Sequence, residues 1–576
     1  MLPTTRWIIA DEKLPERIYE YSSNLSVLPI ISTMLINRGV SDVNEGRRFL
    51  SPSLKDLHNP FLMRDMEEAV SRILRAVAGK EHIVVYGDYD ADGITATAIL
   101  VLFLRSIGAS VSYYIPDRIT EGYGLNLRAI GTLKERGCSL IVTVDCGVSD
   151  FDEVAYATSL GVDCIVVDHH EVPSRLPAAV AVINPHREDC SFPCKYLAGA
   201  GVAFNVLIAL RSRLRAAAFW DGRPYPNLKD YLDLVALGTI GDLVPLVDEN
   251  RIFAKVGLDV LSKTSRPGLR ALKRRSGADR SILTAEVLSF ALIPRINAAG
   301  RMGTATAAVE LLLTKDEGQA AVLTERLESY NQRRKEVEIA ILESVVAAIE
   351  RDPSLGEQRS FVFASKRWHP GVIGIVASKL VDRYYRPTVL FCLKDGIGRG
   401  SGRSIEEFNL FGGISKRCAP FLVTYGGHQY AAGCTIREEN IDLFSQALEG
   451  AIREDLGHHI PLPTTHIDGL FDISGITTDL LNQIDLLSPF GPMNPEPLLC
   501  MSGVKAQSLT LVGNNHLKMQ LANDEHRCDS IWFSKGEYGA MLRDAMLSIV
   551  YTPQINEWNG ERKIQLKVRD VRIMNP

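Results

Sequence analysis

The sequence predicts a multidomain α/β protein with four structured parts: a doubly wound parallel-sheet domain, a long connecting helix, a smaller α/β domain and a C-terminal β-barrel of the OB type. A chain of 576 residues is too long for one hydrophobic core of ordinary size. Continuous apolar runs alternate with helix-period segments in two stretches, as buried parallel strands and their covering helices require. Five short alternating runs divided by turns follow, which is typical of a small barrel.

In the first α/β domain, apolar runs predict the strands and helix-period segments predict the helices. Strands are expected at 83–86, 111–115, 140–144 and 164–167. Helices are expected at 66–77, 95–107 and 153–160. Residues 319–350 keep helical period without Gly or Pro, which predicts a helix that connects two domains.

A second α/β pattern and a run of short strands complete the chain. The second pattern comprises residues 361–364, 371–380, 388–392 and 443–453. After the break at Pro461–Pro463, barrel strands are expected at 504–511, 516–521, 530–533, 545–550 and 563–568. The predicted parts are a lead-in 1–63, a first α/β domain 64–315, a connecting helix 316–352, a second α/β domain 353–460 and a barrel 461–576.

Composition excludes several classes of protein. Hydrophobic residues make up 46% and charged residues 23%, as in folded globular chains. The apolar runs are far shorter than the roughly 18 residues that span a bilayer, and the segment Met1 to Ala10 lacks the features of a secretory signal. We therefore expect a cytoplasmic protein without membrane contact. The expected oligomeric state is a monomer. A net charge of −5 argues against a binder held by bulk charge, but not against a nucleic-acid enzyme with a local groove.

The ten cysteines are scattered, and we expect them to be reduced core thiols. Cys190 and Cys194 have a spacing found in zinc sites. No second pair lies near them in the sequence, so two semi-buried thiols are the favoured interpretation.

The strongest chemical feature is the segment Asp88-Tyr-Asp-Ala-Asp-Gly93, which follows a predicted buried strand directly. Ligands of open parallel sheets bind at the carboxyl ends of strands. A helix N-cap and a solvated turn would explain one or two of these aspartates. Three at alternate positions repel one another unless a cation lies between them. An EF-hand is disfavoured because the closing glutamate is absent.

Two further predicted strands also end in aspartate, followed in one case by a histidine pair. These are Val144-Asp145-Cys-Gly and Val167-Asp168-His169-His170, and Asp242 follows an apolar helical segment. Asp242 alone could simply begin a turn. Together the carboxylates and imidazoles predict a shared site for Mn²⁺ or Mg²⁺. Two such ions would promote phosphoester hydrolysis by a two-metal route.

These motifs resemble the DHH phosphoesterase superfamily and, within it, the RecJ family of single-strand-specific exonucleases. The resemblance covers nearly the whole chain, and it includes four further segments: Pro294-Arg-Ile-Asn-Ala-Ala-Gly-Arg-Met302, Trp368-His-Pro-Gly-Val-Ile-Gly-Ile-Val-Ala377, Gly400-Ser-Gly-Arg-Ser404 and Tyr425-Gly-Gly-His428. It implies a DHH domain, a DHH-associated (DHHA1) domain and an OB-fold domain. It also implies 5′ to 3′ degradation of single-stranded DNA to mononucleotides, in recombination and repair.

The resemblance also implies residue roles. The expected ligands of two divalent ions are Asp90, Asp92, Asp145, His169 and Asp242. Asp88 belongs to the same motif as a catalytic candidate, and His170 is expected beside the scissile phosphate as a polariser or acid. Tyr86 stands where many superfamily members have a metal-binding His, so one ion is expected to bind more weakly or through water.

Candidate substrate-binding residues lie in both α/β domains. Arg403, Ser404 and His428 are expected at the phosphate of the entering DNA end, since a guanidinium matches phosphate geometry. Their glycine flanks 400–402 and 426–427 also fit two tight turns. Arg295, Asn297 and Arg301 are expected to face the groove, although surface charge on a connector is the alternative.

Two weaker features could contact the strand. The densest basic stretch, from Arg266 to Arg280, contains Lys273, Arg274 and Arg275 and either tracks the DNA backbone or forms a solvated face. In the barrel the stacking candidates are Trp532, Phe533 and Trp558, although such aromatics are more often core residues.

Three functions remain open from the residues. The first is the single-strand exonuclease, with single-strand-binding protein and a repair helicase as expected partners. The second is a phosphodiesterase acting on short oligonucleotides, cyclic dinucleotides or pyrophosphate, for which a barrel is superfluous. The third is an inactive single-strand-binding scaffold, which would have no use for concentrated acidic charge.

Overall fold

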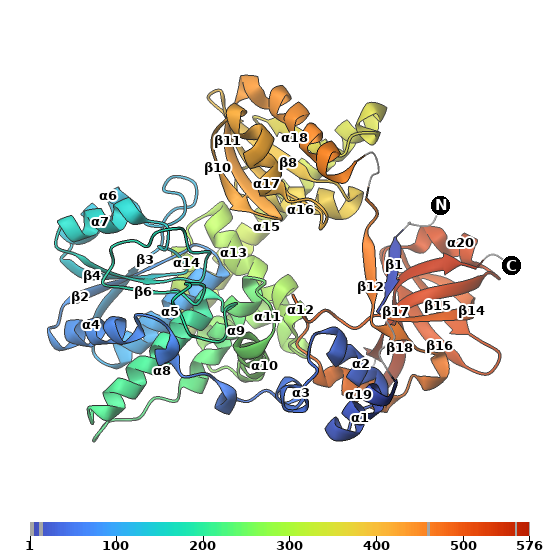
Figure 1. Cartoon of the computed structure of the whole chain (residues 1–576), viewed down its shortest axis with the longest axis horizontal. Helices are drawn as coiled ribbons and strands as arrows, with labels where there is room; N and C mark the ends of the chain where they lie inside the picture. The colour runs from blue at the N-terminus through green and yellow to red at the C-terminus, as the bar shows by residue number, and fades with distance from the viewer. Residues whose placement is uncertain (1–4, 11–14, 458–460, 559–560, 575–576) are drawn as a thin grey trace. The chain divides into compact units, whose positions relative to one another are not determined.

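The structure is a computed structural model that describes residues 5–10, 15–457, 461–558 and 561–574 (Figure 1). It divides into two compact units. The larger unit comprises Asn59–Asp242 and Leu258–Leu462, and the smaller comprises Met1–His58, Leu243–Gly257 and Pro463–Pro576.

A five-stranded parallel sheet forms the centre of the first α/β domain. Its strands follow the order β3-β2-β4-β5-β6. Their bounds are β2 His82–Gly87, β3 Ser110–Tyr114, β4 Cys138–Val144, β5 Asp163–Val167 and β6 Ala181–Ile183. The chain moves outward from β2 to β3 and then returns to β4 on the other side of β2, so the order reverses between β2 and β4. This reversal is the switch point at which doubly wound sheets bind ligands, and it confirms the predicted fold class of this domain.

Helices cover both faces of this sheet. Their bounds are α4 Met66–Ala78, α5 Ala91–Ser106, α6 Leu127–Glu135, α7 Phe151–Ser159, α8 Gly199–Ala216 and α9 Leu232–Gly241. Helices α6 and α7 pack on the face that carries Val84 and Tyr86. Helix α5 contacts α8 and α9 and is buried along most of its length, which explains its nearly continuous apolar sequence.

A helical segment connects the two α/β domains. It contains α10 Asp248–Ser262, α11 Pro267–Ser276, α12 Ala285–Val287, α13 Ile293–Met302, α14 Thr306–Leu313 and α15 Glu317–Arg351. A single π-helical turn, Leu288–Leu292, joins α12 to α13. Helix α15 is the connecting helix predicted from residues 319–350, and Asp316 caps it by accepting a hydrogen bond from the Gln319 N–H.

The second α/β domain has a mixed five-stranded sheet in the order β10-β11-β9-β8-β7. The strands are β7 Phe361–Ser365, β8 Thr388–Lys394, β9 Ile397–Arg403, β10 Leu422–His428 and β11 Ala431–Arg437. The helices are α16 Ile373–Tyr384, α17 Leu410–Gly413 and α18 Ile441–Leu456. The glycine-rich segments 400–402 and 426–427 therefore belong to strands, and the alternative of two tight turns is wrong for them.

The smaller unit contains the predicted barrel. Strands β14-β15-β16-β18-β17 pair in that order, and an additional β14–β17 pairing closes a five-stranded barrel. The bounds are β14 Leu499–Val512, β15 His516–Ala522, β16 Arg527–Trp532, β17 Met546–Trp558 and β18 Glu561–Ile573. Short elements flank it: β12 Thr464–Ile467, β13 Gly469–Leu470, α19 Thr478–Leu486 and α20 Gly539–Leu542.

The N-terminal segment shares a core with this barrel. It forms β1 Arg6–Ile9, α1 Pro15–Leu25, α2 Pro29–Asn37 and α3 Val43–Leu50. Ile31 and Met34 of α2 belong to the same buried cluster as barrel residues Val504 and Ile549. Strand β1 also pairs in parallel with β12. The described residues 5–10 and 15–58 are thus packed as a structural part of the smaller unit.

Two sequence expectations concern the chain as a whole. All ten cysteines lie outside disulfide bonds, and eight of them are buried. Within the ranges that the structure describes, no helix is both long enough and apolar enough to span a membrane.

Candidate active site

The turn after β2 brings three aspartates to the switch point of the sheet. Asp88 is buried. Asp90 is the N-cap of α5 and accepts hydrogen bonds from the Asp92 and Gly93 N–H groups at 2.9 and 3.2 Å. Gly93 is required there, because a Cβ at this position would lie 2.6 Å from the Asp88 carbonyl oxygen. The capping alternative therefore applies to Asp90 and leaves Asp88 and Asp92 unexplained.

Asp92 is fully buried and is held by the N-terminus of α8. Its carboxylate accepts hydrogen bonds from the Gly199 and Ala200 N–H groups at 2.6 and 2.9 Å, where the helix dipole favours a negative charge. Gly238 on α9 lies against the same carboxylate, since a Cβ there would be 2.5 Å from Asp92 Oδ1. The glycine of the segment before Asp242 thus permits close packing at the site.

Asp145, His169 and Asp242 converge on the same point. His169 Nε2 lies 3.0 Å from Asp145 Oδ1, 3.5 Å from Asp242 Oδ2 and 3.9 Å from Asp92 Oδ2. Asp145 directly follows β4 and has a left-handed backbone with φ of 62°. Asp242 is the C-cap of α9. Four separate segments therefore supply one cluster.

Three sets of atoms in this cluster could hold a metal ion, with the atoms of each set within 4.8 Å of one another. They are Asp88, Asp90 and Asp145; Asp92, His169 and Asp242; and Asp145, His169 and His170. Within the described residues, three buried atoms of this cluster make no hydrogen bond: Asp88 Oδ1, Asp145 Oδ1 and His169 Nε2. Unpaired buried oxygens and an imidazole nitrogen suit a divalent cation of the Mn²⁺ or Mg²⁺ type.

The pKa shifts of these residues also indicate a site for divalent cations. Burial, then the neighbouring carboxylates, raises the pKa of Asp92 and of Asp242 to about 7. Burial likewise raises the pKa of Asp88 and Asp145 well above the ordinary value. Burial lowers the pKa of His169, which favours the neutral form that ligates metals. Protons or metal cations must neutralise the negative charge of the clustered carboxylates.

His170 differs from His169 in its partner. Burial alone would lower the pKa of His170, but its hydrogen bond with Asp168 and the charge of that carboxylate raise it to about 9. The bond joins Nδ1 to Asp168 Oδ1 at 2.7 Å. Asp168 also accepts from the Val148 and His169 N–H groups. His170 is thus held as a cation at neutral pH beside the carboxylates.

Tyr86 takes no part in the cluster. Its buried hydroxyl donates to the Gly124 carbonyl at 3.0 Å and accepts from Asn126, and its ring stacks on Tyr114. His82 is bonded to Ser112 at 2.8 Å. Neither residue therefore supplies a ligand at the position where many superfamily members have a histidine.

The three α13 candidates lie in different surroundings. Asn297 Oδ1 accepts from the Ala91 N–H at 2.7 Å and so holds the aspartate turn. Arg301 donates to the Gly371 carbonyl at 3.0 Å, and burial lowers its pKa to about 10. Arg295 is paired with Glu328 of α15. Asn297 and Arg301 are thus tied to the site and to the second domain, whereas Arg295 is tied to α15.

Arg403 and His428 are neighbours in the sheet of the second domain. Ala431 of β11 pairs with both residues, one on each side, so the three lie side by side at one end of the sheet. Arg403 Nη1 donates to the Gly402 carbonyl, and the Ser404 hydroxyl donates to the Phe408 carbonyl at 2.7 Å. His428 is exposed.

The basic stretch around α11 is largely neutralised. Arg274 and Arg270 both pair with Glu317, and Arg275 pairs with Glu325 at 2.8 Å. Lys273 donates to the Leu261 and Ser262 carbonyls. The acidic partners lie on α15, far along the chain, so the sequence stretch by itself did not reveal them.

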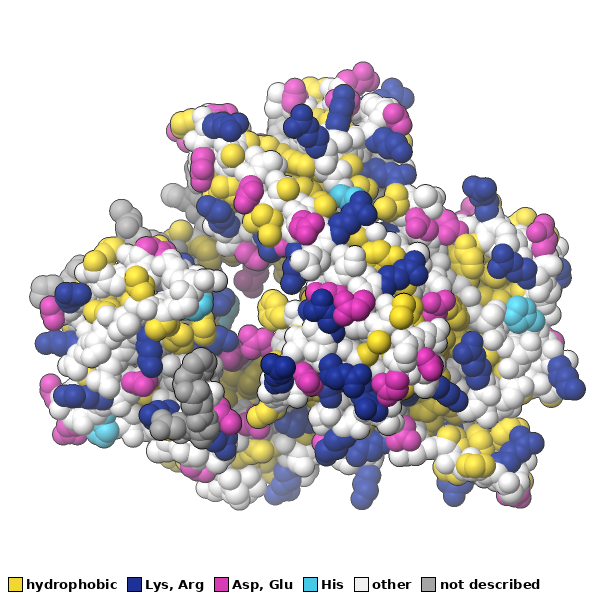
Figure 2. Space-filling model, turned by 180° about the vertical axis from the view of Figure 1, so that it is seen from behind, with side chains coloured by type: hydrophobic (Ala, Val, Ile, Leu, Met, Phe, Trp, Pro, Cys, Tyr) yellow, Lys and Arg dark blue, Asp and Glu magenta, His cyan; other side chains and the backbone are white. Residues whose placement is uncertain are grey.

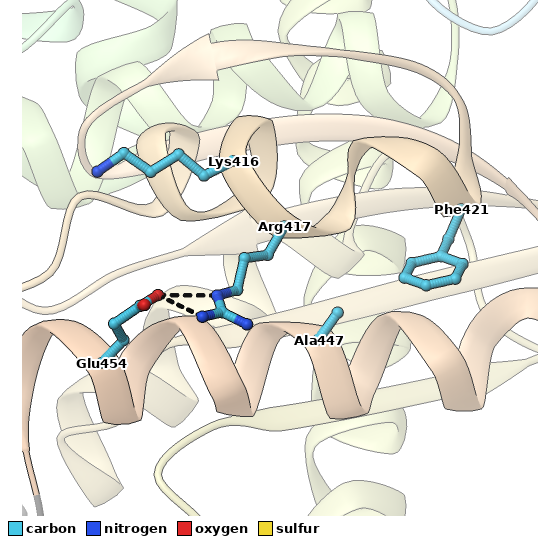
Figure 3. A pocket seen from close by; sticks show the side chains of 5 residues that line it. All are labelled: Lys416, Arg417, Phe421, Ala447 and Glu454. Atoms are coloured by element: carbon cyan, nitrogen blue, oxygen red, sulfur yellow. Dashed lines mark hydrogen bonds and ion pairs between the residues drawn. The ribbon is translucent and has the colours of Figure 1, made fainter.

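Barrel aromatics and surface cavities add little to this site. Trp532 is 2% exposed and belongs to the core, whereas Phe533 is 45% exposed; the side chain of Trp558 lies outside the described residues. A surface cavity of about 610 Å³ lies between α18 and the π-turn Ile414–Cys418 (Figure 3). An Arg417–Glu454 ion pair crosses it, and it contains none of the clustered aspartates.

The sequence placed Asp168 among the strand-end aspartates of the predicted metal site, but it marked no role for two further residues beside the cluster. In the structure Asp168 holds His170 through their hydrogen bond at 2.7 Å. The Tyr123 hydroxyl donates to the Asp145 carbonyl at 3.0 Å and lies 3.1 Å from His170 Nδ1. The Arg118 guanidinium stacks on the Tyr89 ring at 4.8 Å and lies close enough to lower the pKa of Arg301 and of Arg403. Tyr123 and Arg118 lie on a loop after β3, where no sequence motif marked them.

Together, the switch-point cluster, the second α/β domain and the barrel define a DHH-type phosphoesterase of three domains. The model of the DHH family, N-terminal domain, matches residues 82–239, that of the DHHA1 domain matches 358–454, and that of the RecJ OB domain matches 467–570.

Curated relatives span nearly the whole chain. The single-stranded-DNA-specific exonuclease RecJ of Bacillus subtilis (strain 168) is 37% identical over 563 residues, 97% of this chain and 70% of the relative. That of Escherichia coli (strain K12) is 36% identical over 561 residues, 94% of this chain and 96% of the relative. The crystal structure of RecJ in complex with Mn²⁺ from Thermus thermophilus matches with a TM-score of 0.84 at 30% identity, covering 99% of this chain and 80% of that one. The chain belongs to the RecJ family, which confirms the resemblance.

Proposed function

We propose that this protein is a single-stranded-DNA-specific 5′ to 3′ exonuclease that releases 5′-mononucleotides in DNA recombination and repair. The observation that carries the proposal is the buried cluster of carboxylates and imidazoles at the switch point of the sheet. Relatives at 36–37% identity over nearly the whole chain are named single-stranded-DNA-specific exonucleases, which supports the choice of substrate.

The residues fit two divalent ions, Mn²⁺ or Mg²⁺. Asp90, Asp92, Asp145, His169 and Asp242 would hold them, and Asp145 belongs to two of the three sets of converging atoms. When bound, the ions would polarise the phosphodiester and lower the pKa of water. The buried atoms Asp145 Oδ1 and His169 Nε2 support this assignment, because they lie 3.0 Å apart and neither makes a hydrogen bond within the described residues. Solved structures of RecJ from Thermus thermophilus contain Mn²⁺ in one case and Mg²⁺ in another.

His170 would act directly on the substrate. Its raised pKa of about 9 keeps it protonated at neutral pH, so it can donate a hydrogen bond to a phosphate oxygen or a proton to the leaving oxygen. Asp168 positions the ring and stabilises its charge. Asp88 would complete the acidic motif. The roles of His170, Asp168 and Asp88 are thus argued from the protein's own side chains.

The second α/β domain would hold the DNA end. Arg403 and His428 are neighbours in register, and Arg403 lies within electrostatic reach of Arg118 and Arg301. A guanidinium group binds phosphate by paired hydrogen bonds. Arg403, Ser404, His428 and Arg301 would therefore bind the terminal phosphate and orient the strand, with Asn297 supporting the metal turn. Arg295, Lys273, Arg274 and Arg275 would contribute less, because acidic or carbonyl partners already engage them.

Hydrolysis of matched substrates tests the proposal. A long single strand, the same strand in a duplex and a dinucleotide are each incubated with Mn²⁺, with Mg²⁺ or with a chelator. We expect rapid metal-dependent loss of the long single strand only. Preferred hydrolysis of the dinucleotide would favour the oligonucleotide phosphodiesterase, and binding without hydrolysis under every condition would favour the scaffold.

Further expectations accompany this function. A cytoplasmic location, a monomeric state, and single-strand-binding protein and a repair helicase as partners all remain predictions. Sedimentation of the purified chain tests the monomeric state, co-purification from cells tests the partners, and cell fractionation tests the location.

A further inference from the structure

The end of α8 carries a group of cations and aromatic rings, which we call the arginine–aromatic tip; Arg215, Arg223 and Tyr225 in it are exposed, and the other members are half-buried. Its members are Arg211, Arg215, Phe219, Trp220, Arg223 and Tyr225. Between residues 211 and 226 the only acidic residue is Asp221. In Figure 1 the end of α8 projects from the larger unit at the lower left of the view.

The rings and guanidinium groups of the tip are stacked on one another. Arg211 and Arg215 lie over the Tyr225 ring at 5.1 and 5.9 Å, and Arg223 lies over the Phe219 ring at 4.3 Å. Trp220 contacts both Phe219 and Tyr225 edge to face. Arg211 also donates to the Pro226 carbonyl at 3.2 Å. Stacking fixes a guanidinium by its flat face and leaves its other in-plane N–H donors available, so little side-chain entropy is lost when they bind an anion.

The tip is not neutralised as other basic segments are. In the described part of the chain, neither Arg215 nor Arg223 has a carboxylate partner, although Arg213 pairs with Glu67. The denser stretch around α11 is matched by Glu317 and Glu325. Over most of the face shown in Figure 2, Lys and Arg side chains alternate with Asp and Glu. The tip therefore keeps an uncompensated positive charge.

The tip lies far from the acidic cluster. Helix α8 begins at Gly199, whose N–H binds Asp92, and ends at Ala216. At about 1.5 Å per residue the helix places the tip about 27 Å from the cluster. An extended single strand has about 6–7 Å between successive phosphates, more than the rise of about 3.4 Å along a duplex strand, so at least about four nucleotides are needed to span this distance. Nothing at the tip can touch the reacting phosphodiester.

We propose that the arginine–aromatic tip is a second nucleic-acid contact, which binds the sugar–phosphate backbone of a single strand whose end occupies the active site. The inference rests on the proposed function, which supplies the polyanion. Guanidinium donors held on aromatic rings suit phosphate oxygens, and single-strand affinity depends mainly on such contacts.

A double variant, Arg215→Gln with Arg223→Gln, tests the inference in the full chain. Binding to a 30-nucleotide strand is measured as a function of salt, in the presence of a chelator so that no hydrolysis occurs. We expect about tenfold weaker binding at low salt and a salt slope smaller in magnitude by about 1.4, since each lost phosphate contact removes about 0.7. Hydrolysis of a two-nucleotide or three-nucleotide strand should stay within twofold of the unaltered protein, because such a strand is too short to reach the tip.

Matched controls separate the tip from general electrostatics. The control variant, Arg417→Gln with Arg453→Gln, removes the same charge from the π-helical turn Ile414–Cys418 and from α18. These arginines already pair with Glu454 and Glu449, so the salt slope should be unchanged. Tyr225→Leu should weaken long-strand binding and Tyr225→Phe should not, because only the first removes the stacking ring.

Equal salt slopes for the tip variant and the unaltered protein would overturn the inference and would leave an acidic protein segment as the ligand class for this surface. Equal losses in the tip and control variants would also overturn it. Absence of hydrolysis in the unaltered protein would instead contradict the proposed function, while the binding slopes still report on the tip.

Discussion

Asp145 combines three unfavourable features: full burial, a left-handed backbone and close contact with other carboxylates. Strain and unpaired charge of this kind persist where function requires them. The same features make this residue the best probe of the cluster. Asparagine tolerates the left-handed backbone and keeps the shape of the side chain while removing the charge.

Asp145→Asn should lower hydrolysis by at least about 10³-fold, because a shared ion ligand is lost. Without metal its melting temperature should equal or exceed that of the unaltered protein, because one repelling charge is gone. Hydrolysis rates and thermal melts in a chelator check both outcomes. Retained nuclease activity would contradict the site assignment.

Asp150 provides a pH-dependent test outside the metal cluster. Burial, partly offset by a hydrogen bond from the Leu125 N–H, raises its pKa from 3.8 to about 6. The folded state therefore binds a proton more tightly than the unfolded state, and stability from this group increases as pH falls from about 6 to 4. Asp150→Asn should remove up to about 3 kcal/mol of this dependence. Urea unfolding of both proteins at pH 7 and pH 4 measures it; parallel pH curves would contradict the assignment.

At the residue scale, the sequence predicted the site residues whose side chains, carboxylates and imidazoles, are ordinary metal ligands. Asp88, Asp92, Asp145, His169 and Asp242 come together as the spacing and the resemblance indicated. Residues whose role depends on distant partners could not be predicted. The pairing of Arg295 with Glu328, for example, depends on how α13 packs against α15.

At the scale of elements, one buried arginine organises the end of α19. Arg251 on α10 donates to the carbonyls of Leu486, Leu487 and Ser488 and to that of Phe49, at 2.8–3.0 Å. It therefore satisfies the free carbonyls at a helix C-terminus, which otherwise lack partners. Burial lowers its pKa to about 9.

Arg251→Met should destabilise the smaller unit by about 3–5 kcal/mol, because several buried carbonyls lose their donors at once. Lys255→Met is the matched control one turn further along α10, where a single bond to the Ser488 hydroxyl is lost, and it should cost about 1 kcal/mol. Calorimetry compares the two variants. Equal effects would show that Arg251 has no special role.

The glycine-rich strands show where prediction of elements failed. Segments 400–402 and 426–427 fit turns by composition, yet they lie in β9 and β10. Gly400 is required in a strand because a Cβ there would lie 2.4 Å from the Phe391 ring. The contact with Phe391 on the neighbouring strand β8 requires glycine at this position of the strand. The local sequence does not reveal that contact.

At the scale of the whole molecule, bound metal should contribute to stability. The cluster concentrates buried charge, so ions that bind only the folded state stabilise it by about 2.7 kcal/mol at one hundred times their dissociation constant. Mn²⁺ should therefore raise the melting temperature of the unaltered protein, and Asp145→Asn should lose most of that increase. An equal increase in both proteins would place the ions elsewhere.

The order of the domains along the chain was predictable from the sequence, but the assignment of segments to the two compact units was not. Periodicity and turn signals distinguished two α/β patterns, a connecting helix and a barrel. The N-terminal helices show only short amphipathic runs, and their partners in the barrel core come more than 400 residues later. Local sequence carries no information about such a contact.

A time course on 5′- and 3′-labelled copies of one single strand tests the central claim most directly. With Mn²⁺, the 5′ label should appear at once as a mononucleotide, while the 3′ label passes through a ladder of shortening strands. With a chelator, or with Asp145→Asn, neither label should move. First release of the 3′ label, or release that is independent of metal, would contradict the account.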